Sequence, residues 1–389
     1  MLTLLKNGEV FAPESLGRKD ILLSNHTIAA VADPGTIQIR GADVDRIEAE
    51  NKIILPGFID SHVHILGGGG EGGPATRAPE ITLEDIINSG VTTVIGCLGT
   101  DGTTRYMTSL LAKARGLEAE GVNTFIFSGS YEIPVVTITG SVRSDLVLIE
   151  KVVGAGEIAI SDHRSAQPTF EDFAKLAAEC RVGGMLGGKA GVLHCHMGGG
   201  PRKMELIHRL IAETEIPSSQ IIPTHVNRNR DLLEEAVVFM QSGGFVDLTA
   251  GLDPGSDEDE ISIASSVEFF RSRRASLDQI SVSSDSNGSM PRFDSSGRLI
   301  GLTIATQESL LLNFRHLVSR EILSLSEAAS IFATNPSVFY KFTDKGKVKA
   351  GMDADIIILD QNLNLTDHFI KGKRMMGNGK LVVQGTFSS

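Results

Sequence analysis

The pattern of hydrophobic and polar positions divides this chain into three parts. Up to about residue 55, apolar residues alternate with polar ones in short runs that end at turn residues, and no helical period appears. Alternation of this kind is typical of short strands with one buried face. The sequence therefore predicts an all-β unit with strands at Thr3–Leu5, Gly8–Phe11, Asp20–Leu23, Thr27–Val31 and Arg46–Glu48.

The end of the chain has the same pattern. Short apolar runs separated by Gly and Asn predict strands at Gly346–Val348, Ala354–Leu359, His368–Ile370 and Lys380–Val383. Neither end is long enough to bury a hydrophobic core by itself. We therefore expect residues 1–55 and 346–389 to combine in one small β-sandwich domain.

Between residues 56 and 345 the pattern changes to strands that alternate with helices. Apolar runs predict eight strands, at Phe58–His64, Thr93–Leu98, Thr124–Ser128, Ile158–Asp162, Val192–His196, Ile221–His225, Phe245–Thr249 and Ile280–Ser284. Helical periodicity predicts helices that include Leu83–Asn88, Ser109–Glu120, Phe170–Val182, Met204–Glu213 and Asp231–Ser242. This alternation favours an α/β fold, a TIM-type (β/α)8 barrel over residues 56–345, although an open doubly wound sheet has the same pattern.

Composition narrows the classes of function. The 389 residues include 36 Lys and Arg against 48 Asp and Glu, a formal net charge of −12, and no surplus of positive charge is available for nucleic acid. The cysteines Cys97, Cys180 and Cys195 are too few and too scattered for a disulfide framework or a cysteine-based zinc site. No apolar run approaches 18 residues and the N-terminus has no leader pattern. We therefore expect a cytoplasmic protein that binds no membrane.

Candidate chemistry begins at the end of the first strand of the α/β region. The apolar run from Pro56 ends in His62 and His64, and side chains two apart in a strand point to the same face. Both imidazoles can therefore reach one metal ion. Zinc and similar ions take imidazole and carboxylate ligands, and enough of these follow for two ions that share a bridge. The further candidates are Glu157 just before the fourth strand, His196 and His225 at strand ends, Asp285 after the eighth strand, and His194 as a rival to His196.

Charged and aromatic residues near these strand ends suggest a substrate site. Arg164 and Arg228 could bind carboxylates with their forked guanidinium groups, although a structural ion pair is the commoner role of such residues. Glu71 lies in a glycine-rich loop whose backbone can approach a ligand closely, so it could hold an α-ammonium group; a plain flexible linker is the alternative. Tyr131 lies in the loop of residues 129–134, which is suited to acting as a lid.

These residues lie in motifs that resemble a known family. The signature Pro-Gly-Phe-Ile-Asp-x-His-x-His at residues 56–64 is similar to the opening of the metal-dependent amidohydrolase superfamily. Within that superfamily, the chain resembles the isoaspartyl (β-aspartyl) dipeptidases nearly from end to end. The segments that carry this second resemblance are Gly67–Glu71, Gly99–Asp101, Ser161–Arg164, Pro223–Asn229 and Ser283–Ser289.

The resemblance implies two divalent metal ions, which we expect to be zinc, and it assigns their ligands. The implied ligands are His62, His64 and Asp285 for one ion, His196 and His225 for the other, and Glu157 between both. The implied substrate contacts are Gly69, Glu71, Thr100, Tyr131, Arg164, Arg228 and Ser289, with Tyr131 also supporting the oxyanion. Members of the family assemble as octamers, so the resemblance implies a homo-oligomer.

One position departs from the family pattern. Isoaspartyl dipeptidases usually carry a lysine, carboxylated by carbon dioxide, ahead of Ala-Ile-Ser-Asp-His-Arg on the fourth strand, where this chain has Glu157. A carboxylate has the same negative charge as a carbamate and can also bridge two cations with its two oxygens, although its arm is shorter. We interpret Glu157 as a substitute bridge. The alternative is a surface residue at a loop end, with the second metal weakly held.

The candidate chemistry predicts hydrolysis of an amide. Two ions that share a water lower its pKa from about 15.7 towards about 7 and polarise a carbonyl oxygen. The bridging hydroxide could then attack, while Asp285 takes the proton and passes it to the leaving amine. Together with this chemistry, the resemblance to isoaspartyl dipeptidases implies cleavage of the side-chain-derived amide of β-aspartyl dipeptides. The alternatives are a cyclic-amide hydrolase of the dihydroorotase or hydantoinase kind, whose substrates have no ammonium for Glu71, and an inactive scaffold on the same fold.

Overall fold

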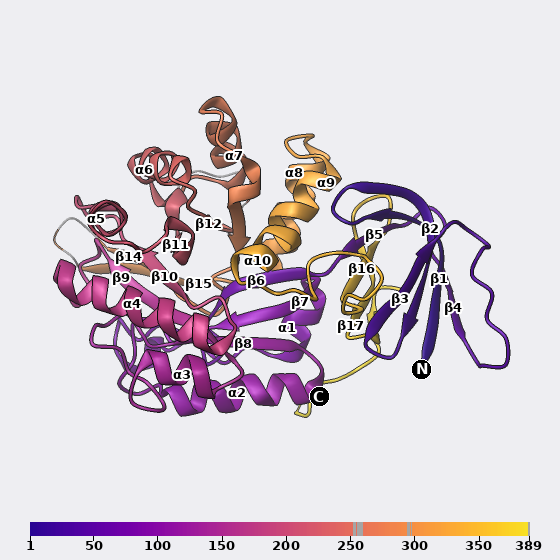
Figure 1. Cartoon of the computed structure of the whole chain (residues 1–389), viewed down its shortest axis with the longest axis horizontal. Coiled ribbons are helices and arrows are strands. Elements are labelled where there is room, and N and C mark those ends of the chain that lie inside the picture. Colours follow the sequence, from indigo (N-terminus) through magenta and orange to yellow (C-terminus); the bar gives the residue numbers. More distant parts are fainter. Residues whose placement is uncertain (252–253, 255–259, 294–295, 297, 388–389) are drawn as a thin grey trace.

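The computed structural model describes residues 1–389 except 252–253, 255–259, 294–295, 297 and 388–389. The chain forms a larger part, in which parallel strands are surrounded by helices, and a smaller part built from strands (Figure 1). The strands of the smaller part come from both ends of the chain, as their indigo and yellow colours show. The functional candidates all belong to the larger part.

Eight parallel strands form the centre of the larger part. Six of them make one curled sheet in the order β11-β10-β9-β8-β7-β6, and β12 pairs with β13. This pair continues the curve, because β12 lies against β11 and β13 lies against β6. All eight predicted strands are present, and only the start of β9 differs from its prediction by more than two residues. The strands are β6 (Phe58–Val63), β7 (Val91–Gly96), β8 (Asn123–Ser128), β9 (Val152–Ile160), β10 (Val192–Met197), β11 (Ile221–Thr224), β12 (Val246–Thr249) and β13 (Ile280–Ser283).

Helices cover the outside of this sheet (Figure 1). Thr82 and Thr169 each begin a helix with a capping box, in which the threonine side chain and a first-turn aspartate satisfy the free backbone N–H groups. The five predicted helices are present, and α4 extends five residues beyond its prediction. The helices are α1 (Leu83–Asn88), α2 (Met107–Glu120), α3 (Val142–Leu148), α4 (Phe170–Gly187), α5 (Glu205–Glu213), α6 (Arg230–Gln241), α7 (Ile263–Ser272), α8 (Glu308–Ser319), α9 (Leu325–Ala329) and α10 (Asn335–Phe339).

The central strands are buried on both faces. Every residue of β6, β7, β9 and β10 is buried, which is expected of parallel strands covered by helices. One face of each strand packs under the helices, and the other points into the interior of the curled sheet. The interior-facing positions of β6, β9 and β10 include histidines and a glutamate, whose burial needs partners.

Strands from both chain ends share one nine-stranded sheet. Its order is β19-β18-β17-β16-β5-β1-β2-β3, with β4 beside β1. The two ends meet where β5 pairs with β16 in antiparallel, and apolar side chains such as Ile21, Ile54, Ile356 and Phe369 are buried in one cluster. The strands are β1 (Leu2–Phe11), β2 (Ser15–Ser24), β3 (Thr27–Ala32), β4 (Asp45–Glu48), β5 (Ile53–Pro56), β16 (Ile356–Leu359), β17 (Leu365–Ile370), β18 (Lys373–Gly377) and β19 (Lys380–Leu381).

Two predictions for the chain ends are wrong. The predicted strands Thr3–Leu5 and Gly8–Phe11 form the single strand β1. No turn separates them; instead the pairing of β1 with β2 shifts its register between Leu5 and Gly8. A Cβ atom on Gly8 would lie 2.3 Å from Cδ1 of Ile54, so this glycine serves packing rather than a turn. Residues 346–348 form no strand, because Gly346 has a φ of 77° and its carbonyl accepts a hydrogen bond from Thr334.

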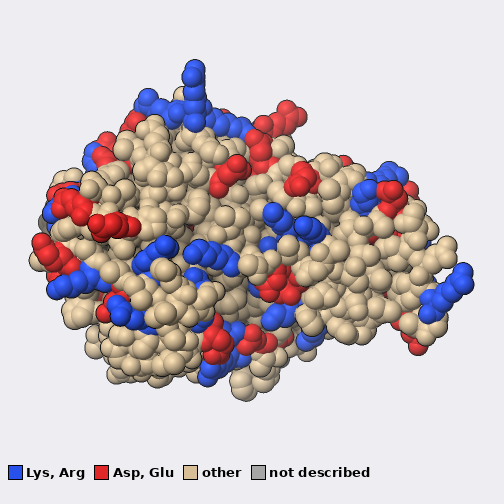
Figure 2. All heavy atoms as spheres, in the orientation of Figure 1, with Lys and Arg blue, Asp and Glu red and all other residues tan. Residues whose placement is uncertain are grey.

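An unpredicted antiparallel hairpin, β14 (Ser289–Phe293) with β15 (Leu299–Ile304), follows the last central strand. It lies close to the functional candidates, because it begins at Ser289. On the face of the molecule drawn in Figure 2, acidic and basic side chains are interspersed. Within the described part of the chain, no helix has both the length and the apolar character needed to cross a membrane.

Candidate metal centre and substrate site

The six predicted metal ligands come from five central strands and meet at one point. They lie in or just after the C-terminal halves of these strands, which is the edge where α/β barrels carry their chemistry. Glu157 lies inside β9 rather than ahead of it, so it is a buried strand residue and not a residue at a loop end. The ligand cluster consists of His62, His64, Glu157, His196, His225 and Asp285.

Glu157 is at the centre of the ligand cluster. Its Oε2 atom lies 3.2 Å from His62 Nε2, 3.1 Å from His196 Nδ1 and 3.6 Å from His225 Nε2. Its Oε1 atom lies 3.4 Å from His64 Nε2. Because the residue is only 1% exposed, this carboxylate faces four imidazoles and almost no solvent.

Asp285 closes the ligand cluster on its more open side. Its Oδ1 atom lies 3.0 Å from His64 Nε2 and 3.4 Å from His62 Nε2, and its side chain is 15% exposed. Asp60 holds the segment before it, because its carboxylate accepts hydrogen bonds from the Ser284 N–H at 3.1 Å and the Ser284 hydroxyl at 2.5 Å. Burial raises the pKa of Asp60 to about 6. The first and last central strands are thereby joined beneath Asp285.

Four polar atoms in the ligand cluster are buried without a hydrogen-bond partner. They are His62 Nε2, Glu157 Oε1, His225 Nε2 and Asp285 Oδ1, as judged over the described residues. Buried polar atoms in folded proteins are nearly always bonded, so this convergence requires a further partner. Imidazole nitrogens and carboxylate oxygens within 4.8 Å of one another are the donors that divalent metal ions take. The cluster therefore fits metal ions.

The charges in the ligand cluster also suit cations. Burial alone would raise the pKa of Glu157, but His62 and the neighbouring imidazoles hold this pKa well below its usual value. Burial alone would lower the pKa of His62, but Glu157 raises it well above its usual value. Burial lowers the pKa of His225 to about 3, so its imidazole is neutral. Metal ligands must be deprotonated; Glu157 and His225 meet that condition, whereas His62, whose pKa is raised, would release its proton when a metal ion binds.

His194, the rival of His196, has a different environment. Its Nε2 atom is hydrogen-bonded to His62 Nδ1 at 2.9 Å, and its Nδ1 atom lies 3.2 Å from the Tyr340 hydroxyl. Its ring stacks on Phe127. Both ring nitrogens of His194 therefore have partners other than Glu157. The hydrogen bond from His194 to His62 Nδ1 orients the His62 ring so that its Nε2 atom faces the ligand cluster, as partners of metal-binding histidines do.

Tyr131 and Arg164 lie on the other side of His196. The Tyr131 hydroxyl is 2.9 Å from His196 Nδ1, and burial followed by the nearby Glu157 charge raises the pKa of Tyr131 well above its usual value. The phenol therefore keeps its proton and can donate a hydrogen bond. Arg164 lies over the Tyr131 ring at 5.3 Å and makes two hydrogen bonds with Asp162, at 2.9 and 3.0 Å.

Glu71 is held at the mouth of the site by predicted substrate contacts. Its Oε1 atom accepts hydrogen bonds from Thr100 at 3.0 Å and Arg164 at 3.3 Å, and its Oε2 atom accepts one from Ser289 at 2.9 Å. Gly69 lies beside Ser289, because a Cβ atom on Gly69 would be 3.2 Å from Ser289 Cβ. Gly69, Thr100, Arg164 and Ser289 therefore surround this carboxylate, and with Glu71 they form what we call the polar group around Glu71.

Arg228 is less tightly engaged than Arg164. It lies 3.9 Å from Asp162 Oδ2 and 3.5 Å from Glu260 Oε1, and its side chain is 24% exposed. It follows β11, on the same side of the site as His225. Among the described residues, the ion pairs of Arg228 are therefore longer than the 2.9 Å pair of Arg164 with Asp162.

Two residues of the site are missed by sequence reasoning. Cys97 belongs to a potential metal-ligating group with His62, His64 and Glu157, although the number and scatter of the cysteines argue against such a role. A sequence signal for Cys97 exists, because it directly follows a central strand, as His64 and His225 do. Asp162 accepts from Arg164 and lies 3.2 Å from His196 Nε2, and it stands in a family motif that gives no role to this residue.

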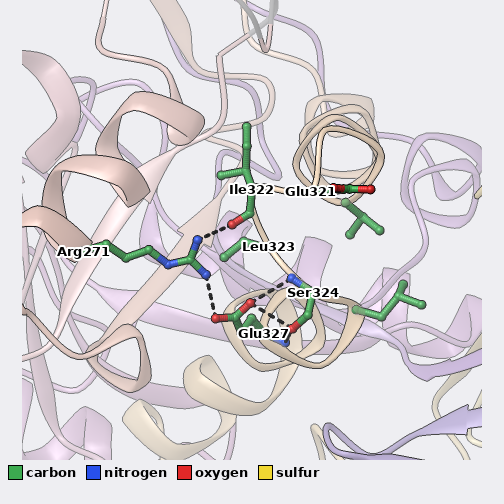
Figure 3. Close-up of a pocket in the computed structure, with 8 residues that line it drawn as sticks. Arg271, Glu321, Ile322, Leu323, Ser324 and Glu327 are labelled. Atoms are coloured by element: carbon green, nitrogen blue, oxygen red, sulfur yellow. Dashed lines mark hydrogen bonds and ion pairs between the residues drawn. The ribbon is translucent and has the colours of Figure 1, made fainter.

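A separate pocket lies away from the ligand cluster (Figure 3). It measures about 400 Å³ and lies between α7 and the start of α9. Arg271 spans it, donating to the Ile322 carbonyl and pairing with Glu327 at 2.6 Å. Arg271 and Glu327 satisfy each other, and none of the residues that line this pocket belongs to the ligand cluster.

Comparisons with known proteins agree with this geometry. The amidohydrolase family model matches residues 53–386. The chain is similar to the β-aspartyl dipeptidase of Fervidobacterium islandicum AW-1, solved in complex with β-Asp-Leu, with a TM-score of 0.94 and 42% identity over 99% of both chains. An adenine deaminase of Halalkalibacterium halodurans is 24% identical over 98% of this chain, which spans 58% of that protein's length. A Listeria monocytogenes dihydroorotase is 32% identical over 41% of this chain and 34% of its own.

Proposed function

Because this chain belongs to the amidohydrolase family, we propose that it is a metal-dependent hydrolase that cleaves β-aspartyl (isoaspartyl) dipeptides. One observation carries the proposal: the ligand cluster, with its unpartnered buried atoms, is joined to the polar group around Glu71 by Arg164, which lies 3.3 Å from His196 Nε2 and 3.3 Å from Glu71 Oε1. An anionic residue beside a metal site is suited to a substrate with a free ammonium group. The Fervidobacterium enzyme, which resembles this chain along its whole length, was crystallised with such a substrate.

We assign two divalent ions, with zinc as the expected metal, to the ligand cluster. His62, His64 and Asp285 would hold one ion, His196 and His225 the other, and Glu157 would lie between them; its contacts of 3.1 to 3.6 Å with all four imidazoles support this role. When bound, two such ions activate a water and polarise a carbonyl oxygen.

Asp285 is our candidate for proton transfer. It is the most exposed member of the ligand cluster, so it can contact both the attacking water and the leaving group. His64 holds the pKa of Asp285 below its usual value against the effect of burial. Asp285 therefore begins the reaction as a carboxylate, accepts the proton of the water and donates it to the departing amine nitrogen. Tyr131, which keeps its proton, would donate a hydrogen bond to the carbonyl oxygen as negative charge develops there.

The remaining predicted residues would bind the two ends of the dipeptide. Glu71 would pair with the α-ammonium group of the aspartyl residue, while Gly69, Thr100 and Ser289 keep Glu71 in place and line the site. Arg164 and Arg228 would bind carboxylates. Arg164 would have to share its guanidinium group with Asp162, whereas the contacts of Arg228 at 3.5 and 3.9 Å are weak enough to be exchanged.

Substrate selectivity tests this proposal against its alternatives. A buried site built for charged groups leaves them unpaired when the substrate lacks those groups, which can cost factors of about 10⁴. The zinc-loaded protein should therefore hydrolyse β-Asp-Leu far faster than α-Asp-Leu or dihydroorotate, as measured by kcat/KM. Comparable values for dihydroorotate would support a cyclic-amide hydrolase, and no hydrolysis of any of the three would support an inactive scaffold.

A Glu71→Gln variant tests the ammonium site separately. Loss of one charged hydrogen bond costs roughly 1.5 to 3 kcal/mol, so kcat/KM for β-Asp-Leu should fall about ten- to one-hundred-fold. N-acetyl-β-Asp-Leu has no ammonium group and serves as the control substrate. Its low rate should be the same in both proteins. An equal loss on both substrates would mean that Glu71 supports the loop and does not bind the ammonium group.

We further propose the division of the chain and its assembly. Residues 56–345 would form a closed (β/α)8 catalytic barrel, and residues 1–55 with 346–389 a β-sandwich domain. A homo-oligomer, an octamer by resemblance, is supported by the exposure of Leu148, Met185 and Leu186 on α3 and α4. We expect a dipeptide as the only ligand besides metal, and neither nucleic acid nor membrane. A cytoplasmic location is supported by three free cysteines.

A further inference from the structure

Cys97 lies at the ligand cluster although it is not among the predicted ligands. It directly follows β7, and its backbone N–H donates to the Val63 carbonyl at 3.0 Å. This bond ties Cys97 to the strand end that carries His62 and His64. The Cys97 Sγ atom is 3.7 Å from His64 Nδ1 and 4.0 Å from His64 Nε2, and the residue is 1% exposed. The sulfur is therefore inside the site.

The surrounding groups form a complete set of donors. The ligand atoms of His62, His64, Cys97 and Glu157 all lie within 4.8 Å of one another. Glu157 Oε1, which faces this side, is buried and has no hydrogen-bond partner among the described residues. Two imidazoles, a sulfur and a carboxylate oxygen are all ligands of the kinds that zinc takes, and Asp285 would be a fifth ligand of the same ion. The segment after Cys97 packs directly on this group, because a Cβ atom on Gly99 would lie 2.5 Å from His64 Cε1.

Glu157 has a shorter side chain than a carboxylated lysine, and the Cys97 sulfur could supply part of the negative charge around the two ions. Glu157 Oε2 contacts His62, His196 and His225, whereas only Oε1, at 3.4 Å, serves His64. Two divalent ions carry four positive charges, and Glu157 and Asp285 supply two negative charges. A thiolate at Cys97 adds a third on the His64 side, which Glu157 serves with its Oε1 atom alone.

We propose that Cys97 is a metal ligand, which binds through its sulfur the ion that His62, His64 and Glu157 also bind. This inference rests on the two-ion site of the proposed function and adds a ligand to it. Because thiolates favour zinc, cobalt and cadmium over the harder manganese and magnesium ions, Cys97 would make the site selective for the softer metals. A mixed thiolate and carboxylate centre follows, in place of one with oxygen and nitrogen ligands only.

The other two cysteines provide matched controls. Cys180, on α4, and Cys195, on β10, are both buried in the main hydrophobic core. Burial raises the pKa of Cys180 to about 12, and neither residue belongs to a potential metal-ligating group within the described parts of the chain. A Cys180→Ala variant therefore removes a buried thiol without touching the site.

Cobalt-substituted protein tests the proposal with a spectroscopic signature that does not depend on turnover. A cobalt ion bound to a thiolate has an intense sulfur-to-metal charge-transfer band in the near ultraviolet. We expect this band in the wild type and in Cys180→Ala, and its loss in Cys97→Ser and Cys97→Ala. A wild-type protein that binds cobalt without the band, or a Cys97→Ser variant that keeps it, would overturn the assignment.

Zinc X-ray absorption on the wild type gives a second readout that needs no variant. We expect a sulfur shell at about 2.3 Å with half a sulfur per zinc, because one of two ions would have the thiolate. A spectrum with nitrogen and oxygen shells alone would also overturn the assignment. The outcome is distinct from that of the proposed function: hydrolysis of β-Asp-Leu without a sulfur signal refutes only the role of Cys97, whereas a sulfur signal without hydrolysis refutes only the dipeptidase proposal.

Discussion

Removal of the Glu157 carboxylate should expel metal from the ligand cluster. Glu157 faces all four imidazoles at 3.1 to 3.6 Å, so its carboxylate is placed to reach both proposed ion positions. A Glu157→Gln variant keeps the size and shape of the side chain but removes its charge. Any loss of metal in this variant is therefore caused by the missing negative charge and not by a cavity left in the site.

The magnitude follows from Coulomb's law. Two divalent ions about 4 Å apart repel each other by about 17 kcal/mol at an effective dielectric constant of 20, and a bridging carboxylate about 2 Å from each attracts each ion by about the same amount. Other ligands and solvent screen most of this energy. Because about 1.4 kcal/mol corresponds to a factor of ten in affinity, even one tenth of the attraction weakens each ion's binding more than tenfold.

Elemental analysis after dialysis provides the assay. We expect about two zinc ions per chain in the wild type, and about one or fewer in Glu157→Gln and Glu157→Ala. Because a glutamate needs no carbon dioxide, reloading of the metal-free wild type should proceed equally well with and without bicarbonate. Two ions in the variants together with full activity would refute the bridging role, and bicarbonate dependence would point to a carboxylated lysine elsewhere.

Three further predictions concern other groups. Asp285→Asn should lower kcat for β-Asp-Leu by roughly two or more orders of magnitude, and near wild-type turnover would remove Asp285 from the mechanism. Tyr131→Phe should lower kcat by about 10²-fold with little change in KM. Burial lowers the pKa of His368 to about 4, against about 6.5 when unfolded, so the unfolded chain binds more protons between these values. The free energy of unfolding should fall by up to about 1.4 kcal/mol for each unit that the pH drops in that window, and less steeply in His368→Asn.

The central part of the fold could be predicted because its strands are buried on both faces. Short runs rich in apolar residues, such as Val192–Met197, differ clearly from the helical segments beside them, and the C-terminal ends of such runs locate His62 and Asp285, whereas the choice of His196 over His194 rested on the family resemblance. The strands at the chain ends were harder to predict, because their boundaries depend on which strands pair with each other. The break expected between Leu5 and Gly8 is absent, because Leu2–Phe11 pairs with β2 as the single strand β1, in which Gly8 leaves the space that the Ile54 side chain occupies.

The residues of the ligand cluster could be predicted because histidine and carboxylate side chains are common metal ligands. Histidines and carboxylates at strand ends identified the residues that meet in the ligand cluster, whereas the expected substrate roles, such as that of Glu71 in its glycine-rich loop, stay predictions. Cys97 was missed because cysteines were judged by number and spacing, and its distance of 3.7 Å from His64 arises only when β7 and β6 lie side by side. The role of His194 likewise depends on which partner its ring meets, which alternation along a strand leaves open.

One measurement tests the account most directly: the crystal structure of zinc-loaded Asp285→Asn in complex with β-Asp-Leu, with anomalous diffraction at the zinc edge. We predict two anomalous peaks about 3.5 to 4 Å apart on either side of Glu157, with the side-chain amide of the substrate facing them and its ammonium group on Glu71. A single peak remote from Glu157, or a dipeptide bound with its ammonium group away from Glu71, would contradict the account.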